Sequence, residues 1–254
     1  MRYRVLGVTH VGLARDVNQD NFYVDGSLRG LEQDTADIEK VLSENGQWIA
    51  AVFDGMGGEN DGEIASLIAA EITKRICEEN SAPYDVETII ATINDVICAE
   101  MAARRSSMGS TCVFLQFDND KYKAWNLGDS RAYRFHEGEL IQLTKDHTEA
   151  AYYASIFMDE DIRIGSENKL TQHLGVPGDE FVIEPFATEW MPLREHDLIM
   201  ICTDGLTHHA TDEEIRGVFK REMDLREKKE SLLKLALERG GLDNITIILI
   251  EACA

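Results

Sequence analysis

Long apolar runs are absent from this sequence of 254 residues. No stretch approaches the roughly 18–20 apolar residues that a membrane-spanning helix needs. His10, Arg15 and Asp16 interrupt the N-terminal segment before an apolar signal-peptide core can form. These absences predict a cytoplasmic protein without a membrane partner.

Cysteine is sparse, and no two cysteines are spaced as Cys-x-x-Cys. Most of the five lie in apolar runs, so we interpret them as reduced core residues rather than disulfide partners or zinc ligands. They are Cys77, Cys98, Cys112, Cys202 and Cys253.

Positive charge is also scarce: 25 Lys and Arg stand against 47 Asp and Glu, a formal net charge of −22. Such a surface repels phosphate backbones and anionic lipids, which argues against nucleic acid as a partner. The hydrophobic fraction of 44% and charged fraction of 28% are ordinary for globular proteins. With no repeat or convincing linker, residues 1–254 are predicted to form a single domain, and we expect a monomer.

Short apolar or β-rich runs predict strands, and apolar residues at helical spacing predict helices. Helical patterns cover residues 64–76 and 86–101, start again at Thr211 with capping-box spacing, and cover 231–239. Strands are predicted at 49–53, 111–117, 122–127, 131–135, 139–143, 181–186, 197–202 and 245–250.

Tight turns at 118–120 and 136–138 join successive strands as hairpins, which implies antiparallel pairing. The runs at 49–53 and 245–250 are apolar throughout, as expected of strands covered on both faces. The predicted fold class is therefore α+β, a four-layer sandwich of two packed antiparallel sheets flanked by helices on both sides. Residues 148–169 have a weak pattern and are interpreted as a partly helical, mobile flap.

Four aspartates lie where apolar strands begin or end: Asp54, Asp129, Asp204 and Asp243. Three of them adjoin a glycine. A cluster of carboxylates near a core needs a cation, and hard oxygen donors favour Mg²⁺ or Mn²⁺. Each Asp-Gly pair is, however, also an ordinary turn, and spacing alone does not bring the four together. Both interpretations stay open on the residues alone.

Eight short blocks, in order along nearly the whole chain, resemble the motifs of the type 2C, metal-dependent Ser/Thr protein phosphatases, the PPM family. The form of the block at 54–58 is typical of bacterial members. The blocks are Gly12–Asp20, Asp54–Gly58, Gly109–Thr111, Gly128–Arg131, Leu143–His147, Leu170–Gly175, Thr203–Leu206 and Asp243–Thr246.

The resemblance implies a sandwich of two antiparallel sheets with a binuclear Mn²⁺ or Mg²⁺ centre at one edge. Asp54 would bridge the two ions, and the Gly55 carbonyl would bind one of them. Asp204 and Asp243 would hold the other ion, and Asp129 would help to bind a third, weaker one.

The resemblance also assigns roles around the metals. Arg15 would clamp the phosphate with its two parallel donors. Asp20, Gln19 and Asn244 would lie in or near the shell around the metal ligands. Gln19 replaces a glutamate found in some members, which removes one negative charge. Met56 stands where some members have a histidine proposed as the general acid, so the proton donor is unassigned.

Two further residues of the blocks are interpreted as structural. Arg131 is expected to be a local partner near Asp129, and His147 to support the fold.

The function implied is metal-dependent hydrolysis of phosphoserine and phosphothreonine on proteins, by direct attack of a metal-bridging water, reversing Ser/Thr kinase signalling in a bacterial cytoplasm. Two alternatives remain. One is an inactive pseudophosphatase that binds phosphorylated partners. The other is an acidic calcium- or metal-buffering protein, which explains the charge but not Arg15 or the ordered blocks.

Overall fold

Two antiparallel β-sheets packed face to face form the centre of the molecule. This computed structural model describes residues 2–43, 46–57, 61–79, 82–157, 169–178 and 181–253. The first sheet has the strand order β10 (Glu139–Gln142), β9 (Arg131–His136), β13 (Leu198–Cys202), β14 (Ile245–Cys253), β1 (Arg2–His10) and β4 (Thr35–Ser43).

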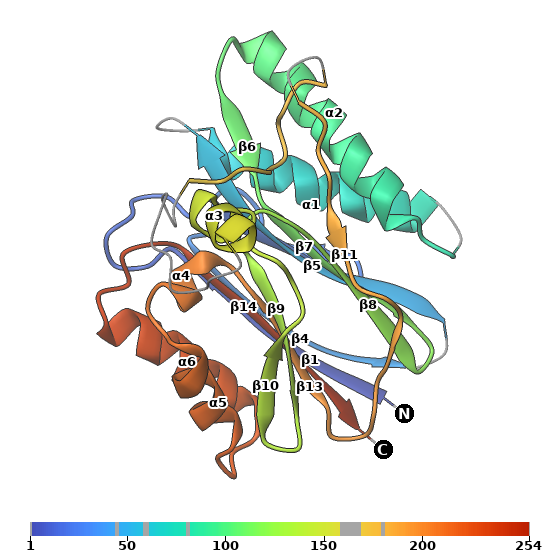
Figure 1. Cartoon of the computed structure of the whole chain (residues 1–254), viewed down its shortest axis with the longest axis vertical. Helices are drawn as coiled ribbons and strands as arrows, with labels where there is room; N and C mark the ends of the chain where they lie inside the picture. Colours follow the sequence, from blue (N-terminus) through green and yellow to red (C-terminus); the bar gives the residue numbers. More distant parts are fainter. Residues whose placement is uncertain are drawn as a thin grey trace.

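The second sheet has the order β11 (Phe186–Ala187), β8 (Lys121–Leu127), β7 (Cys112–Asp118), β5 (Gln47–Gly57), β2 (Asp20–Val24) and β3 (Ser27–Leu28). Two short strands extend it: β12 (Met191–Pro192) pairs with β8, and β6 (Met108–Ser110) pairs with β5. In the first sheet, β1 and β14 pair from Arg2 opposite Cys253 to His10 opposite Ile245, so the two chain ends lie side by side in Figure 1.

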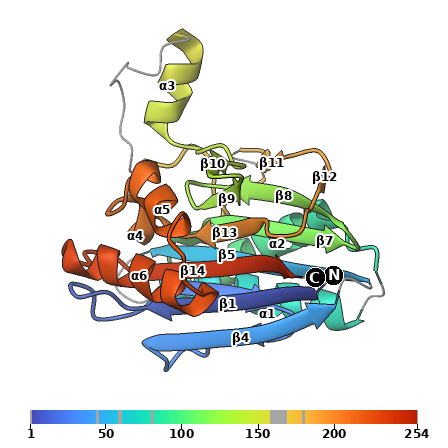
Figure 2. The same ribbon diagram turned by 90° about the horizontal axis from the view of Figure 1, so that it is seen from below.

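Helices cover the outer faces of both sheets (Figure 1). The second sheet carries α1 (Gly62–Glu79) and α2 (Val86–Arg104), and the first carries α4 (Asp204–Thr207), α5 (Asp212–Phe219) and α6 (Leu225–Glu238). In contrast, α3 (Glu149–Phe157) has no buried residue and projects away from the sandwich (Figure 2). None of the helices in the described ranges is both long and apolar enough to cross a membrane.

Three apolar cores separate the four layers, and alternation along the strands divides the side chains among them. In β14, Ile248 and Ile250 face the core between the sheets, whereas Ile247 and Leu249 pack under the helices α4–α6. In β5, Val52 likewise faces the central core while its neighbours pack under α1 and α2. These strands are apolar throughout because both of their faces are covered.

The predicted α+β four-layer sandwich is confirmed. The hairpins β7–β8 and β9–β10 follow the predicted turns. Thr211 forms the predicted capping box with Glu214 at the start of α5.

Other boundaries were wrong or missed. The strand predicted at 181–186 pairs only at Phe186, because Phe181 and Val182 are exposed instead of facing a core. The last helix begins at Leu225, ahead of the predicted 231, after an N-cap at Asp224. Of the predicted flap, 149–157 is helical, and 158–168 lies outside the described residues.

Candidate metal centre

A cleft of about 560 Å³ opens at one edge of the sandwich, where segments distant in sequence meet. The residues that line it are Arg15, Gln19, Asp54, Gly55, Met56, Gly57, Thr111, Asp129, Lys169, Leu170, His173, Asp204, His208 and Asp243. The cleft thus contains seven of the nine site residues named from the sequence. The other two, Asp20 and Asn244, are buried at 0% and 4% exposure and bonded to the segments that form the cleft.

The carboxyl groups in the cleft are close enough to shift one another's pKa. Burial raises the pKa of Asp54 well above its usual value, and the charges of Asp204 and Asp20 raise it further. Burial, and next the charge of Asp204, raise the pKa of Asp129 to about 7. Burial likewise raises the pKa of Asp204. Such a cluster is ionised together only if positive charge is brought in.

Asp20 is the most deeply buried of these acids. It begins β2 and lies opposite Asp54 in the pairing of β2 with β5. Its Oδ2 accepts hydrogen bonds from the hydroxyls of Thr203 at 2.8 Å and Thr246 at 2.7 Å, while Oδ1 has no partner. Burial raises the pKa of Asp20 to about 7, although the two threonine hydrogen bonds act in the opposite direction.

Asn244 ties the segment that carries Arg15 to the start of β14. Its Nδ2 donates to the carbonyls of Val11 at 2.8 Å and Val17 at 3.0 Å. Its Oδ1 accepts a hydrogen bond from the backbone N–H of Gln19 at 2.8 Å. The amide therefore fixes both ends of the loop that brings Arg15 to the cleft.

Arg15 forms an ion pair with Asp243, with 2.8 Å between Nη2 and Oδ2. Hydrogen bonding to Asp243 is the largest cause of the raised pKa of Arg15. In the same cleft, His208 Nδ1 lies 3.3 Å from Asp204 Oδ2. Within the described ranges, no three His, Cys, Asp or Glu side chains are grouped as ligands of one ion.

Two glycines let backbone segments approach closely at the cleft. A Cβ at Gly55 would lie 2.0 Å from the carbonyl oxygen of Gly62 and 2.5 Å from that of Gln19. A Cβ at Gly205 would lie 1.9 Å from the carbonyl oxygen of Asn244. Both positions require glycine because the opposing atoms are backbone and cannot turn aside.

Two other residues of the sequence motifs lie outside the cleft lining. Arg131 pairs with Asp146, at 3.0 Å from Nε to Oδ1, rather than with Asp129. The backbone N–H of Gly128 donates to His147 Nδ1 at 3.1 Å, and burial lowers the pKa of His147. Both side chains thus make local structural contacts.

The cysteines predicted to be core residues divide into two groups. Cys112 and Cys202 are fully buried, and burial raises the pKa of the Cys202 thiol to about 12. Cys77, Cys98 and Cys253 are only partly buried.

Several residues at the cleft were assigned no role from the sequence, although three of them, His173, Thr203 and Thr246, lie within the quoted motifs. Lys169, His173 and His208 line it, and Thr203 and Thr246 hold Asp20. His208 is the C-cap of α4 and follows Asp204 by four residues, a spacing that brings the two side chains to the same side. Thr203 and Thr246 belong to the quoted motifs but were assigned no role, because their role depends on how the end of β13 and the start of β14 meet β2.

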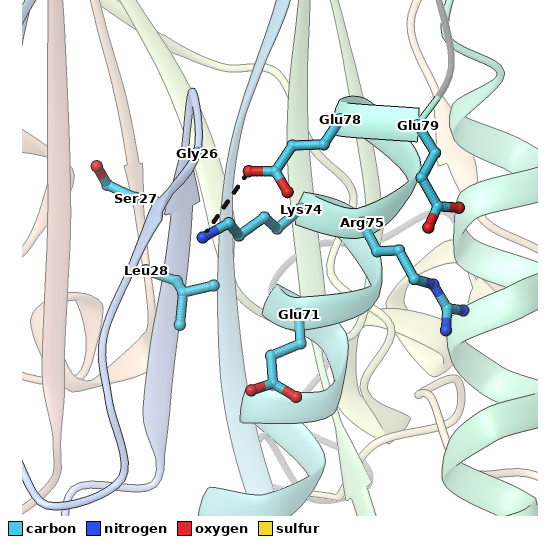
Figure 3. A pocket seen from close by; sticks show the side chains of 8 residues that line it. All are labelled: Gly26, Ser27, Leu28, Glu71, Lys74, Arg75, Glu78 and Glu79. Atoms are coloured by element: carbon cyan, nitrogen blue, oxygen red, sulfur yellow. Dashed lines mark ion pairs between the residues drawn. The ribbon is translucent and has the colours of Figure 1, made fainter.

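A second hollow of about 480 Å³ lies between the β2–β3 turn and α1 (Figure 3). Three acidic and two basic side chains of α1 line it, and Lys74 Nζ lies 3.8 Å from Glu78 Oε1 (Figure 3). This hollow shares no lining residue with the cleft.

Comparison with known proteins gives one consistent family. The family model of protein phosphatase 2C matches residues 30–238. The serine/threonine phosphatase Stp of Listeria welshimeri is 31% identical over 89% of this chain and 92% of its own length. PstP of Mycobacterium tuberculosis is 29% identical over 81% of this chain but only 40% of its own length.

Among solved structures, the serine/threonine phosphatase of S. agalactiae superposes with a TM-score of 0.83 at 26% identity, over 98% of this chain and 99% of the other. The chain belongs to the protein phosphatase 2C family.

Proposed function

We propose that this protein hydrolyses phosphoserine and phosphothreonine in phosphorylated proteins, using divalent ions held in the cleft. Membership of the protein phosphatase 2C family makes it a protein-serine/threonine phosphatase, a phosphoric monoester hydrolase. The observation that carries the proposal is the meeting of Asp54, Asp129, Asp204 and Asp243 with Arg15 in one cleft.

The donor set fits hard divalent cations. The carboxyl groups raise one another's pKa, and a bound cation would relieve that repulsion. Asp20 keeps one buried oxygen without a partner beside them. Carboxylate and carbonyl oxygens are the donors that Mg²⁺ and Mn²⁺ prefer. The catalytic domain of PstP, 24% identical to this chain, was solved with two manganese ions.

In our assignment Asp54 would be a ligand of both ions, and the Gly55 carbonyl would be a ligand of one of them. Asp204 and Asp243 would hold the other ion, and Asp129 would contribute to a third, weaker site. When bound, the ions would supply a water of lowered pKa for direct attack on phosphorus and would offset the phosphate charge.

The residues around the ligands orient substrate and support the site. The Arg15 side chain is 52% exposed and offers two parallel donors to phosphate oxygens once Asp243 is neutralised. The Asn244 side chain holds the backbone N–H of Gln19, so the side-chain amide of Gln19 can orient water in the cleft without adding charge. Met56 has no proton to donate, so water protonates the leaving oxygen in our proposal.

The substrates we propose are proteins phosphorylated by a Ser/Thr kinase, acted on in the cytoplasm by a monomeric, single-domain enzyme. The net charge of −22 supports this choice against nucleic acid and anionic membranes, since both are repelled by such a surface.

Phosphate release from a phosphothreonine peptide tests the proposal. The wild-type protein with Mn²⁺ should release phosphate, and a chelator should stop it. Asp54→Asn should lower kcat/KM by at least about 100-fold because it removes the bridging charge. Asp120→Asn, in the exposed β7–β8 turn, is the matched control and should behave as wild type.

A rate insensitive to chelator would refute the metal-dependent mechanism. Peptide binding without turnover, whichever divalent ion is added, would support the inactive pseudophosphatase instead.

A further inference from the structure

Arg29 is a fully buried arginine that belongs to none of the sequence motifs. Its side chain is 1% exposed. The guanidinium donates hydrogen bonds only to backbone carbonyls, five in the described part of the chain. Burial lowers the pKa of Arg29, and the charge of Asp20 raises it. A buried charge satisfied entirely by main-chain oxygens is costly to maintain and therefore calls for an explanation.

Two of the five carbonyls that Arg29 binds belong to the segment that leads into β2 and starts it. Nη2 donates to the carbonyl of Asn18 and Nε to that of Asp20, each at 2.8 Å. The carbonyl between them, that of Gln19, accepts from the backbone N–H of Gly55 at 3.1 Å. Alternate carbonyls of an extended segment point to opposite sides, so β5 holds one side and Arg29 holds the other.

The guanidinium takes the place of a missing strand partner. β3 pairs with β2 only at Tyr23 and Val24 and ends at Leu28, so it does not reach Asn18 or Asp20. The side chain of Asn21 fixes the main chain of Arg29, accepting from its N–H at 3.0 Å and donating to its carbonyl at 3.1 Å.

The guanidinium of Arg29 also donates hydrogen bonds to the loop before β4. Nη1 donates to the carbonyls of Gln33 at 2.8 Å and Gly30 at 3.0 Å. Arg29 thereby joins this loop to the 18–20 segment, whose Asn18 side chain also donates to the carbonyl of Asp34 at 3.1 Å.

We propose that Arg29 is a positioning residue of the metal site. It fixes the 18–20 backbone. Through the hydrogen bond from the Gly55 N–H to the Gln19 carbonyl it also fixes the peptide unit between Asp54 and Gly55, two residues assigned as ligands. The inference rests on the proposed function, because it concerns how that site is held in place.

The first test is calorimetric titration of the metal-free full chain with Mn²⁺. Arg29→Lys keeps the charge but cannot span the carbonyls of Asn18 and Asp20. It should weaken Mn²⁺ binding by about 10–100-fold, the usual effect of losing an outer support of a metal ligand. Because the loss acts on metal binding, saturating Mn²⁺ should restore most of kcat.

Arg134→Lys is the matched control. Arg134 lies in β9 of the other sheet and is paired with the buried Asp197 at 2.9 Å. Losing that contact should lower the thermal midpoint yet leave Mn²⁺ affinity within about twofold of wild type, because sites that are far apart and share no partner act nearly independently. An equal loss of Mn²⁺ affinity in both variants would mean that Arg29 acts only through general stability, and this result would overturn the proposal.

A measurement on the wild-type protein covers the case in which Arg29→Lys does not fold. By NMR, the Arg29 Nε–H should exchange with solvent far more slowly than that of the exposed Arg239, and Mg²⁺ should shift its resonance. Fast exchange with no response to Mg²⁺ would overturn the proposal.

The outcomes also separate the two proposals. A wild-type protein that binds no Mn²⁺ would overturn the proposed function and this inference with it. Normal wild-type binding with unchanged affinity in Arg29→Lys would overturn this inference alone.

Discussion

Replacing Asp20 by asparagine should stabilise the metal-free protein, and the gain should grow with pH. The folded protein holds the Asp20 pKa at about 7 against 3.8 for an ordinary aspartate, because the carboxyl group is fully buried. An acid with a raised pKa costs stability once the unfolded state ionises, and the cost increases from the unfolded pKa up to the folded pKa. Above about pH 7 the cost is constant.

The size of this stability cost follows from the difference between the folded and unfolded pKa of Asp20. At about 1.36 kcal/mol per pKa unit, the cost of Asp20 is roughly 1.7 kcal/mol at pH 5 and roughly 4 kcal/mol at pH 8. The stability difference between Asp20→Asn and wild type should therefore rise by about 2–3 kcal/mol between these pH values. Asparagine still offers an oxygen to the hydroxyls of Thr203 and Thr246, so the hydrogen bonds at this site are largely kept.

Urea unfolding in the presence of a chelator, at pH 5 and pH 8, measures this difference. Mg²⁺ should shrink the pH dependence of the wild type, because a cation favours the ionised carboxyl group. A stability difference that does not change with pH would refute the reasoning, since it would mean that Asp20 is ionised in the fold at no cost.

Two further substitutions separate the site from the scaffold. Gly55→Ala should lower Mn²⁺ affinity, and it should lower stability by about 1–3 kcal/mol, because its Cβ would press on the backbone of Gly62 and Gln19. Calorimetric titration would measure the affinity and urea unfolding the stability. Wild-type values in both would contradict the close approach of the backbone. Thr211→Ala should cost about 1 kcal/mol through loss of the α5 capping box and leave kcat/KM unchanged. A change in its catalytic rate would show that α5 reaches the site.

Strand positions could be predicted where burial alone dictates the sequence. The segment 245–250 is apolar at every position because one core lies on each side of β14. β1 was missed although it lies between β14 and β4 in its sheet. Its Arg2 and Arg4 interrupt the apolar pattern, and its buried Gly7 is an unfavourable strand former. Neither arginine nor glycine favours a strand, and β1 is a strand because β14 and β4 pair with it on both sides.

The candidate site, like the strands, could be predicted from the sequence only in part. The four aspartates at strand ends, Asp54, Asp129, Asp204 and Asp243, suggested a cation site beside the ordinary turn interpretation. The ordered motifs then favoured the cation site and added Asp20. That these acids share a cleft is a tertiary fact, created by the pairing of β2 with β5 and of β13 with β14. Arg29 could not be identified from sequence, because its partners are backbone carbonyls and any residue provides those.

The acids in the cleft repel one another, so the fold must hold them together before any cation arrives. Main-chain and neutral contacts do much of this: Gly55 N–H binds the Gln19 carbonyl, Asn244 binds Gln19, and threonine hydroxyls bind Asp20. Such contacts position a ligand without neutralising it, whereas a lysine or arginine at each acid would compete with the metal. Two contacts involve a basic side chain, His208 with Asp204 and Arg15 with Asp243, and the second is the more exposed to solvent. This pairing can be exchanged for metal and phosphate at modest cost, because exposed ion pairs contribute little to stability.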